Sequence, residues 1–502
     1  MLATVVSSTL VGVDAVPVSV EVHVADGLPS FSIVGLPDAT CREARDRVRA
    51  ALESSELQWP MRRITVNLAP GGLPKTGAAL DLPIAIGLLV ASEQIPRSQI
   101  ESLGAFGELG LDGSVRPIVG ALPLVDAVPA SRVVVPAGDA CVTALIAGSR
   151  IRPVRCLRDV VDALHCGLPW PDVDLSFPDD PVEPEPDLAD VRGQGQARDA
   201  LEIAAAGGHH LLLVGPPGAG KTMLARRLPG IMPDLAHQDA LAVTRVHSAA
   251  GLRLPLSGLV TRPPFRAPHH NTSMSALVGG GSRSARPGEI SAASGGVLFL
   301  DELGEFPPSV LDALRQPLEE GVVRVARSDG MREHPARVLL VAAMNPCPCG
   351  EGGNVGCRCR PPERVRYSRR ISGPLLDRID LMVQVDRPST PALLSSEPAE
   401  ASCAVAERVA KVREMSALRG VRCNAEMCES LLDEVAWLDE EATLMVADAL
   451  DGGRLSARGL RRLRCVARTI RDLGDAADGL RVIDVSMALQ LRARPPIGGD
   501  HV

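Results

Sequence analysis

The stretch that most constrains this chain runs from Leu211 to Thr222. Its first four residues are apolar, and the next eight fit the phosphate-binding pattern G-x-x-x-x-G-K-[ST]; Met223 to Leu228 are then typical of a helix. Glycines let backbone N–H groups turn toward phosphate oxygens, and a helix start adds partial positive charge. The loop consists of Gly215, Pro216, Pro217, Gly218, Ala219, Gly220, Lys221 and Thr222. The pattern predicts a strand, a nucleotide-binding loop and a helix.

Two side chains of this loop have expected tasks. Lys221 is expected to reach the β- and γ-phosphates of ATP, and the Thr222 hydroxyl to hold Mg²⁺. The chain has only three lysines, at positions 75, 221 and 411, among 53 lysines and arginines. A lysine at this position is therefore a specific signal and not a consequence of composition.

Polar residues that end two further apolar runs complete the predicted ATP site. Val297–Leu300 is followed by Asp301 and Glu302, 80 residues after Lys221. We expect Asp301 to complete the Mg²⁺ shell and Glu302 to polarise the attacking water. Asn345 follows a second apolar run and is predicted to orient the water or the γ-phosphate, although a strand can also end in asparagine without such a role.

Two arginines are candidates for contact with the γ-phosphate. Arg378, in the segment 372–380, is placed where an arginine finger would face the ATP of a neighbouring subunit. Arg458 opens an amphipathic helix and is a candidate γ-phosphate sensor. Arg461 is an alternative to it, because arginines are abundant in this helix.

Composition limits the classes of protein to which the chain can belong. Its 502 residues allow two to four domains, and a net charge of −8 means that any nucleic acid must meet a local arginine patch. The N-terminal residues lack the basic start of a secretory signal, and the longest apolar stretch, Ile84–Val90, is too short to span a membrane. Twelve cysteines without such a signal predict reduced thiols in the cytoplasm.

The region before the phosphate loop predicts an α/β domain over residues 1–168. Residues 1–35 alternate as strands do, with Asp26-Gly27 expected as a hairpin turn. We expect one amphipathic helix over Asp38–Leu57 and a buried helix over Leu80–Ala91. Further predicted elements are a strand over Ile64–Leu68, a hairpin turn at Asp112-Gly113 and a strand over Arg132–Val135.

Short motifs in this region resemble the Lon-protease-type fold. They are Gly71–Gly77 leading into Asp81–Ile86, then Gly107-Glu108-Leu109, and Val115–Ile118. Members of that family cleave peptides with a serine–lysine dyad. This chain has Lys75-Thr76 where the serine is expected, and Gly120–Leu124 where the lysine is expected. The resemblance therefore implies an assembly or binding domain without protease activity.

Composition shifts give the remaining domain boundaries. Residues 169–189 are rich in proline and acidic residues and are predicted to form a linker. We expect the ATPase core over residues 190–387 and a helical lid over 388–502, which includes a helical pattern from Cys403 to Leu418.

Four cysteines form a cluster shortly after Asn345. The pairs Cys347/Cys349 and Cys357/Cys359 are separated by a glycine-rich segment that permits tight turns. Four thiolates suit a structural, tetrahedral Zn²⁺ site, although paired C-x-C is weaker than the usual C-x-x-C spacing. The alternative is two pairs of reduced thiols in a loop.

Two polar, basic insertions are candidates for contact with DNA. The first runs from His269 through a glycine-rich stretch to Arg286 and suits a loop that lines a pore; its histidine pair more often has a structural role. The second, 322–332, predicts a β-hairpin with an Asp329-Gly330 turn, and it carries Arg324, Arg327 and Arg332. Strict alternation places Arg324 and Arg327 on different faces, so a solvated hairpin without a DNA role is an equal alternative.

These motifs together resemble the AAA+ class and, more narrowly, the magnesium-chelatase-like family called YifB or ComM. The specific markers are Phe265–His270, Arg286–Ile290, Leu300–Leu303, Asn345–Gly350, Ser372–Asp380 and Ser456–Arg458. The resemblance covers nearly the whole chain. It implies a homo-hexameric ring that hydrolyses ATP between subunits and acts on DNA, as branch-migrating helicases do. The alternative is the motor subunit of a metal chelatase. The resemblance of the front domain to the Lon-type fold favours the DNA motor, since chelatase motors as a family are expected to lack such a domain.

Overall fold

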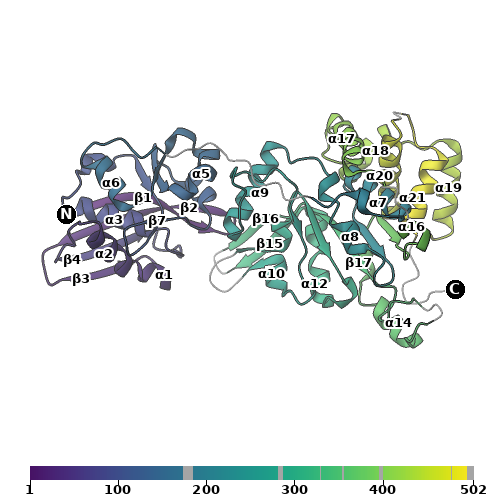
Figure 1. Cartoon of the computed structure of the whole chain (residues 1–502), viewed down its shortest axis with the longest axis horizontal. Helices are drawn as coiled ribbons and strands as arrows, with labels where there is room; N and C mark the ends of the chain where they lie inside the picture. Colours follow the sequence, from purple (N-terminus) through teal and green to yellow (C-terminus); the bar gives the residue numbers. More distant parts are fainter. Residues whose placement is uncertain are drawn as a thin grey trace.

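The computed structural model of the chain describes residues 1–172, 185–280, 286–327, 330–352, 356–394, 399–475 and 478–493. Of Arg327, Gly330 and Leu393 it describes only the backbone. The molecule is elongated, with the N-terminal domain at one end, the phosphate-loop domain in the middle and a helical C-terminal region at the other end (Figure 1). The predicted fold class, an α/β protein with two α/β domains and a helical lid, is confirmed. Most of the predicted linker, residues 173–184, lies outside the described residues.

The N-terminal domain is built on a seven-stranded mixed sheet of order β3-β4-β2-β1-β5-β8-β9. Its strands are β1 (Leu2–Val11), β2 (Asp14–Ala25), β3 (Ser30–Val34), β4 (Arg63–Ala69), β5 (Leu103–Ala105), β8 (Arg132–Pro136) and β9 (Ile151–Val154). A separate small ribbon, β6 (Glu108–Leu109) with β7 (Val115–Arg116), confirms the turn predicted at Asp112-Gly113. The predicted strands over 64–68 and 132–135 are also confirmed.

Helices cover both faces of this sheet because its strands alternate apolar side chains. Val134 packs with α2 (Ala44–Ser54), α3 (Asp81–Ala91) and α6 (Leu157–Leu164), whereas Val133 and Val135 pack with α4 (Ala121–Ala127) and α5 (Ala140–Ala147). Every residue of α3 is buried, which confirms the predicted buried helix.

Two local predictions in this domain are wrong. Asp26-Gly27 does not turn a hairpin, because β4 lies between β2 and β3 and pairs with both. The helix predicted over Asp38–Leu57 is two helices, α1 (Ala39–Arg42) and α2. The Asp38 side chain caps α1 by accepting from the Cys41 N–H, and the buried Cys41 thiol faces the carbonyl of Gly77 at 3.0 Å, which fixes this first turn apart from α2.

The middle domain has a five-stranded parallel sheet of order β11-β14-β17-β10-β18. The strands are β10 (Leu211–Val214), β11 (Phe265–Arg266), β14 (Val297–Leu300), β17 (Leu339–Met344) and β18 (Leu381–Gln384). Helices flanking the sheet include α7 (Gly195–Gly207), α8 (Lys221–Ala225), α9 (His237–Ala250), α10 (Met274–Val278), α11 (Glu289–Ala292), α12 (Pro308–Ala313), α13 (Arg315–Glu320), α14 (Pro361–Ser368) and α15 (Gly373–Leu376). All strands run the same way, so the phosphate loop and the residues after β14 and β17 meet at one edge.

The C-terminal helices share a continuous hydrophobic core with one face of this sheet. They are α16 (Thr390–Leu394), α17 (Ser402–Leu418), α18 (Glu429–Val435), α19 (Glu440–Asp451), α20 (Ala457–Leu473) and α21 (Val482–Arg492). Leu211 and Leu213 of β10 belong to the same buried cluster as Val409 of α17 and Leu463 of α20. The lid is thus packed onto the sheet by apolar contacts.

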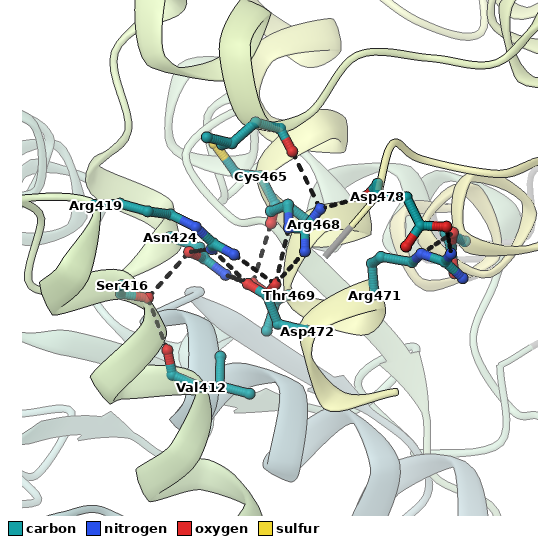
Figure 2. Close-up of polar contacts among 12 residues, drawn as sticks. Val412, Ser416, Arg419, Asn424, Cys465, Arg468, Thr469, Arg471, Asp472 and Asp478 are labelled. Atoms are coloured by element: carbon teal, nitrogen blue, oxygen red, sulfur yellow. Dashed lines mark hydrogen bonds and ion pairs between the residues drawn. The ribbon is translucent and has the colours of Figure 1, made fainter. Parts of the chain in front are cut away.

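A buried polar network ties the lid together (Figure 2). The Asp472 carboxylate accepts hydrogen bonds from Arg419, Asn424 and the fully buried Arg468. Burial raises the pKa of Asp472, but Arg419 and Arg468 outweigh this effect and hold that pKa below its ordinary value. Thr469 extends the network to the sheet domain through His209, whose Nε2 lies 2.8 Å from the Thr469 hydroxyl.

Helix α9 joins the N-terminal domain to the middle domain, as Figure 1 shows. The backbone N–H of Gly120, just before α4, donates to the carbonyl of Ser248 at 2.9 Å. Arg245 pairs with Asp126 at 2.6 Å and with Asp14 at 3.4 Å, beside an apolar contact of Val13 with Val246. In the part of the chain that the structure describes, no helix is long and apolar enough to cross a membrane.

Candidate ATP site

The phosphate loop leaves β10 at Gly215, where the backbone passes close to the next strand. A Cβ at this position would lie 2.0 Å from the carbonyl oxygen of Val385, so only glycine fits. Gly220 has φ +91° immediately before α8, a conformation that glycine adopts without strain. The helix begins at Lys221 and ends at Ala225, earlier than the predicted span of 223–228.

Lys221 is buried and bridges the loop to the neighbouring strand. Its Nζ donates to the carbonyls of Gly215 at 2.6 Å and Pro216 at 3.0 Å, and to Asn345 Oδ1 at 3.1 Å. Burial lowers the pKa of Lys221, and the charge of Asp301 opposes this shift. The structure therefore brings the predicted lysine and the predicted asparagine together at the edge where phosphate is expected.

The two predicted magnesium ligands lie within hydrogen-bond distance of each other. The Thr222 hydroxyl donates to Asp301 Oδ2 at 2.7 Å, and Asp301 Oδ1 accepts from the backbone N–H of Glu302 at 2.9 Å. A hydroxyl and a carboxylate are the oxygen donors that Mg²⁺ takes when it binds with a nucleotide phosphate. The donor set thus fits the ion that the motif implies.

The candidate base, Glu302, has a neighbour that the sequence did not reveal as functional. Its backbone is left-handed, with φ +51°, and its side chain is 57% exposed. His270 Nδ1 lies 3.2 Å from Glu302 Oε2. His270 follows β11, and its ring is packed by His269 and Phe306. The only sequence signal for this contact was the histidine pair, for which a structural role was considered more common.

The two candidate arginines lie away from the phosphate loop of their own subunit. Arg458 lines a cavity of about 880 Å³ that is also lined by the residues at the start of the strands, including His210, Leu339 and Asp380. Strands of four to six residues separate this edge from the phosphate loop by roughly 13–20 Å. Arg461, the alternative, donates to the carbonyl of Met427 within the lid.

The predicted basic hairpin is present as β15 (Val322–Arg327) paired with β16 (Gly330–Pro335). Arg324 is held between two acids, with Nε 2.8 Å from Glu333 Oε1 and with a further contact to Glu320. Arg332 is half-buried. The side chain of Arg327 and the residues of the turn, 328 and 329, lie outside the described residues, as do residues 281–285 of the first insertion.

The four predicted zinc ligands converge. The sulfur atoms of Cys347, Cys349, Cys357 and Cys359 all lie within 4.8 Å of one another. Cys347 and Cys349 are 3.4 Å apart, and Cys349 and Cys357 are 3.5 Å apart. A tetrahedral site with Zn–S bonds of about 2.3 Å spaces its sulfurs by about 3.8 Å. A hydrogen bond from the Glu351 backbone lowers the pKa of Cys349 to about 6, whereas burial raises the pKa of Cys359 to about 12.

The cysteine cluster lies directly beside the phosphate loop. At Gly350, φ is +90°, and an added Cβ would lie 2.4 Å from Cδ of Pro217. The cluster also follows Asn345, the residue that contacts Lys221. A change in the conformation of the cysteine cluster can therefore move the phosphate loop.

A phosphate loop, an acidic pair and a strand-ending asparagine on this parallel sheet define a P-loop ATPase of the AAA+ class. Three family models match separate parts of the chain: "Magnesium chelatase, subunit ChlI" over residues 187–393, "Subunit ChlI of Mg-chelatase" over 20–139, and "Magnesium chelatase, subunit ChlI C-terminal" over 399–492. Because a ChlI model also covers the front domain, that domain does not separate a DNA motor from a chelatase motor.

Curated relatives match this chain over almost its whole length. Competence protein ComM of Haemophilus influenzae is 42% identical over 479 residues, covering 94% of each chain. The uncharacterized protein YifB of Escherichia coli is 41% identical over 510 residues, covering 98% of this chain and 97% of its own. An uncharacterized protein of Mycobacterium tuberculosis is 46% identical over 493 residues, covering 96% of both. The chain belongs to the YifB/ComM family of magnesium-chelatase-like AAA+ ATPases, and this family implies ATP and Mg²⁺.

Proposed function

We propose that this protein is an ATP-driven ring motor that acts on DNA in the cytoplasm, as a branch-migration helicase or translocase in recombination or DNA uptake. The observation that carries its ATPase part is the contact of Lys221 with Asn345 beside the pair Thr222 and Asp301. The DNA part is supported by the near-full-length similarity to a relative named as a competence protein.

In this proposal each residue of the site has one task. Lys221 and the loop backbone bind the phosphates, Thr222 and Asp301 hold Mg²⁺, and Glu302 accepts the proton of the attacking water. Asn345 orients the water or the γ-phosphate. Arg378 and Arg458 act on the ATP of the adjacent subunit, since they lie at the opposite sheet edge from their own loop.

We assign the DNA contact to the hairpin β15–β16 and the subunits to a homo-hexamer. The hairpin is one element that carries Arg324, Arg327 and Arg332 in a protein of net charge −8. Because Glu320 and Glu333 already contact Arg324, a DNA phosphate must displace these carboxylates to bind it. Salt is expected to weaken binding in proportion to the number of phosphates that the arginines neutralise. The triple substitution of these arginines with alanine should abolish stimulation of ATP hydrolysis by DNA.

A second function, the motor subunit of a magnesium chelatase, is favoured by the names of all three matching family models. One experiment separates the two. ATP hydrolysis is measured with forked or single-stranded DNA and, in parallel, with porphyrin plus chelatase partner subunits. Stimulation by DNA supports the DNA motor, and stimulation only by porphyrin with its partners supports the chelatase.

We also propose that the cysteine cluster holds one structural Zn²⁺. The support is the convergence of four sulfurs at spacings near those of a tetrahedral site. Metal analysis of protein purified without chelator should find about one zinc per chain. Cys357→Ser should lose the metal, whereas Cys166→Ser, at an exposed cysteine outside the cluster, should keep it. Zinc-free wild-type protein would overturn the assignment.

A further inference from the structure

A single carboxylate contacts both candidate arginines. Glu319, near the end of α13, places Oε1 2.6 Å from Arg378 Nη2 and 3.8 Å from Arg458 Nη1. Arg378 comes from the segment before β18, and Arg458 from the first turn of α20, so three distant segments meet at this oxygen. No motif around Glu319 predicted that it belongs to this group.

The two arginines differ in how firmly they are held. The side chain of Arg378 is 7% exposed, and it also donates to the carbonyls of Arg315 and Pro374. The side chain of Arg458 is 62% exposed, and its contact with Glu319 is the longer one. Glu319 therefore joins a fixed guanidinium to one that reaches toward solvent.

The charges at this point suit an anion from outside the subunit. One carboxylate between two guanidinium groups leaves a net charge of +1, and Glu319 and Arg458 face the cavity of about 880 Å³. The pairing with Arg378 lowers the pKa of Glu319, so its charge is retained at neutral pH. Without that charge the two guanidinium groups would repel each other and separate.

We propose that Glu319 is a positioning residue: held by the buried Arg378, it aims the exposed Arg458 at the γ-phosphate bound to the adjacent subunit. This inference rests on the proposed ring motor. Glu319 itself does not touch ATP. Its effect is exerted across the subunit boundary, on a nucleotide held by the phosphate loop of the neighbour.

The first test separates substrate binding from turnover. Glu319→Ala should lower kcat for ATP by about tenfold or more while KM stays nearly unchanged, because the arginines act mainly on the transition state. Glu319→Gln keeps the shape of the side chain and one hydrogen bond, so its kcat should lie between that of the wild type and that of Glu319→Ala. The matched control is Glu426→Gln: Glu426 lines the same cavity, is 44% exposed against 42% for Glu319, and pairs with Arg422 instead. Its kcat should be that of the wild type.

The second test mixes two defective chains. Lys221→Ala cannot use its own site but keeps an intact Glu319, whereas Glu319→Ala keeps an intact phosphate loop. Mixed in equal amounts, they should hydrolyse ATP well above the sum of their separate rates, since one subunit completes the site of the next. A merely structural role of Glu319 within its own subunit would give no such recovery.

An Arg378→Ala chain mixed with Lys221→Ala serves as the reference. Recovery with Arg378→Ala but not with Glu319→Ala would overturn the role of Glu319 and leave the ring motor standing. Absence of recovery in both mixtures would overturn the shared site and the inference with it. Recovery in both supports the inference.

Discussion

His270 Nδ1 lies 3.2 Å from a carboxylate oxygen of Glu302, so the candidate base is contacted by a residue from the turn that follows another strand. The histidine follows β11, and the glutamate follows β14, which pairs with β11. Since the Glu302 side chain is more than half exposed, this contact restrains a carboxylate that would otherwise sample several rotamers. His270 is the second residue of the insertion that is expected to line a pore, so the contact links the start of that insertion to the site.

We expect His270→Ala to lower kcat by about tenfold, with little change in KM for ATP. The reason is that Glu302 loses its orientation while the phosphate loop is untouched. Steady-state ATP hydrolysis measures both constants. His237→Ala, at the start of α9, is the control. A wild-type kcat in the His270 variant would show that the contact has no catalytic role.

Gly350→Ala should raise KM for ATP several-fold. The added methyl group would lie 2.4 Å from Pro217, so either the cysteine loop or the phosphate loop must move. Gly356→Ala is a useful comparison, because φ there is also left-handed at +101° but no atom lies within 4 Å of the added Cβ. Nucleotide titration of both variants measures the difference. Equal affinities would mean that backbone strain, and not the contact with Pro217, is responsible.

Asp472→Ala should reduce the free energy of unfolding by about 3–5 kcal/mol, since it leaves the buried Arg468 without its carboxylate. Asp478→Ala, which removes an exposed partner of Arg471, should cost less than about 1 kcal/mol. Because the folded state lowers the pKa of Asp472, its contribution is present above about pH 4 and is lost as the pH falls further. Urea unfolding measures the difference in free energy of unfolding between the wild type and Asp472→Ala. This difference should be smaller at pH 3.5 than at pH 7, and an equal difference at both pH values would contradict the prediction.

Buried His209 should make the protein sensitive to mild acid. Burial lowers its pKa from 6.5 to about 4, so the folded state binds a proton less readily than the unfolded chain. The contribution of His209 to the free energy of unfolding is therefore complete above about pH 6.5. It decreases by up to about 3 kcal/mol as the pH falls toward 4. Urea unfolding across this range should show a shallower decline for His209→Gln. An unchanged slope would assign the acid sensitivity elsewhere.

Residues that belong to short sequence motifs were predicted more fully than residues whose role depends on contacts between distant segments. The phosphate loop, Asp301 and Asn345 were expected to lie close together, and they do, because parallel strands bring their carboxyl ends to one edge. The four cysteines also converge as expected, because their spacing along the chain is short. In each case the chemistry is encoded within a few neighbouring residues.

What the sequence did not reveal depends on segments that are distant along the chain. Glu319 is one acid among 61 aspartates and glutamates, and nothing near it marks Arg378 or Arg458 as its partners. The Asp26-Gly27 turn was predicted wrongly because β4, nearly forty residues later, inserts between the two strands. Such pairings follow from the tertiary fold, which local periodicity does not specify.

The central claim, that ATP is hydrolysed between subunits of a ring, is tested most directly by measuring particle mass and ATP hydrolysis together over a range of protein concentrations. Nucleotide and forked DNA are present throughout. The account predicts that the rate per chain rises in step with the fraction of chains in a ring. A protein that remains monomeric and still hydrolyses ATP at its full rate would contradict it.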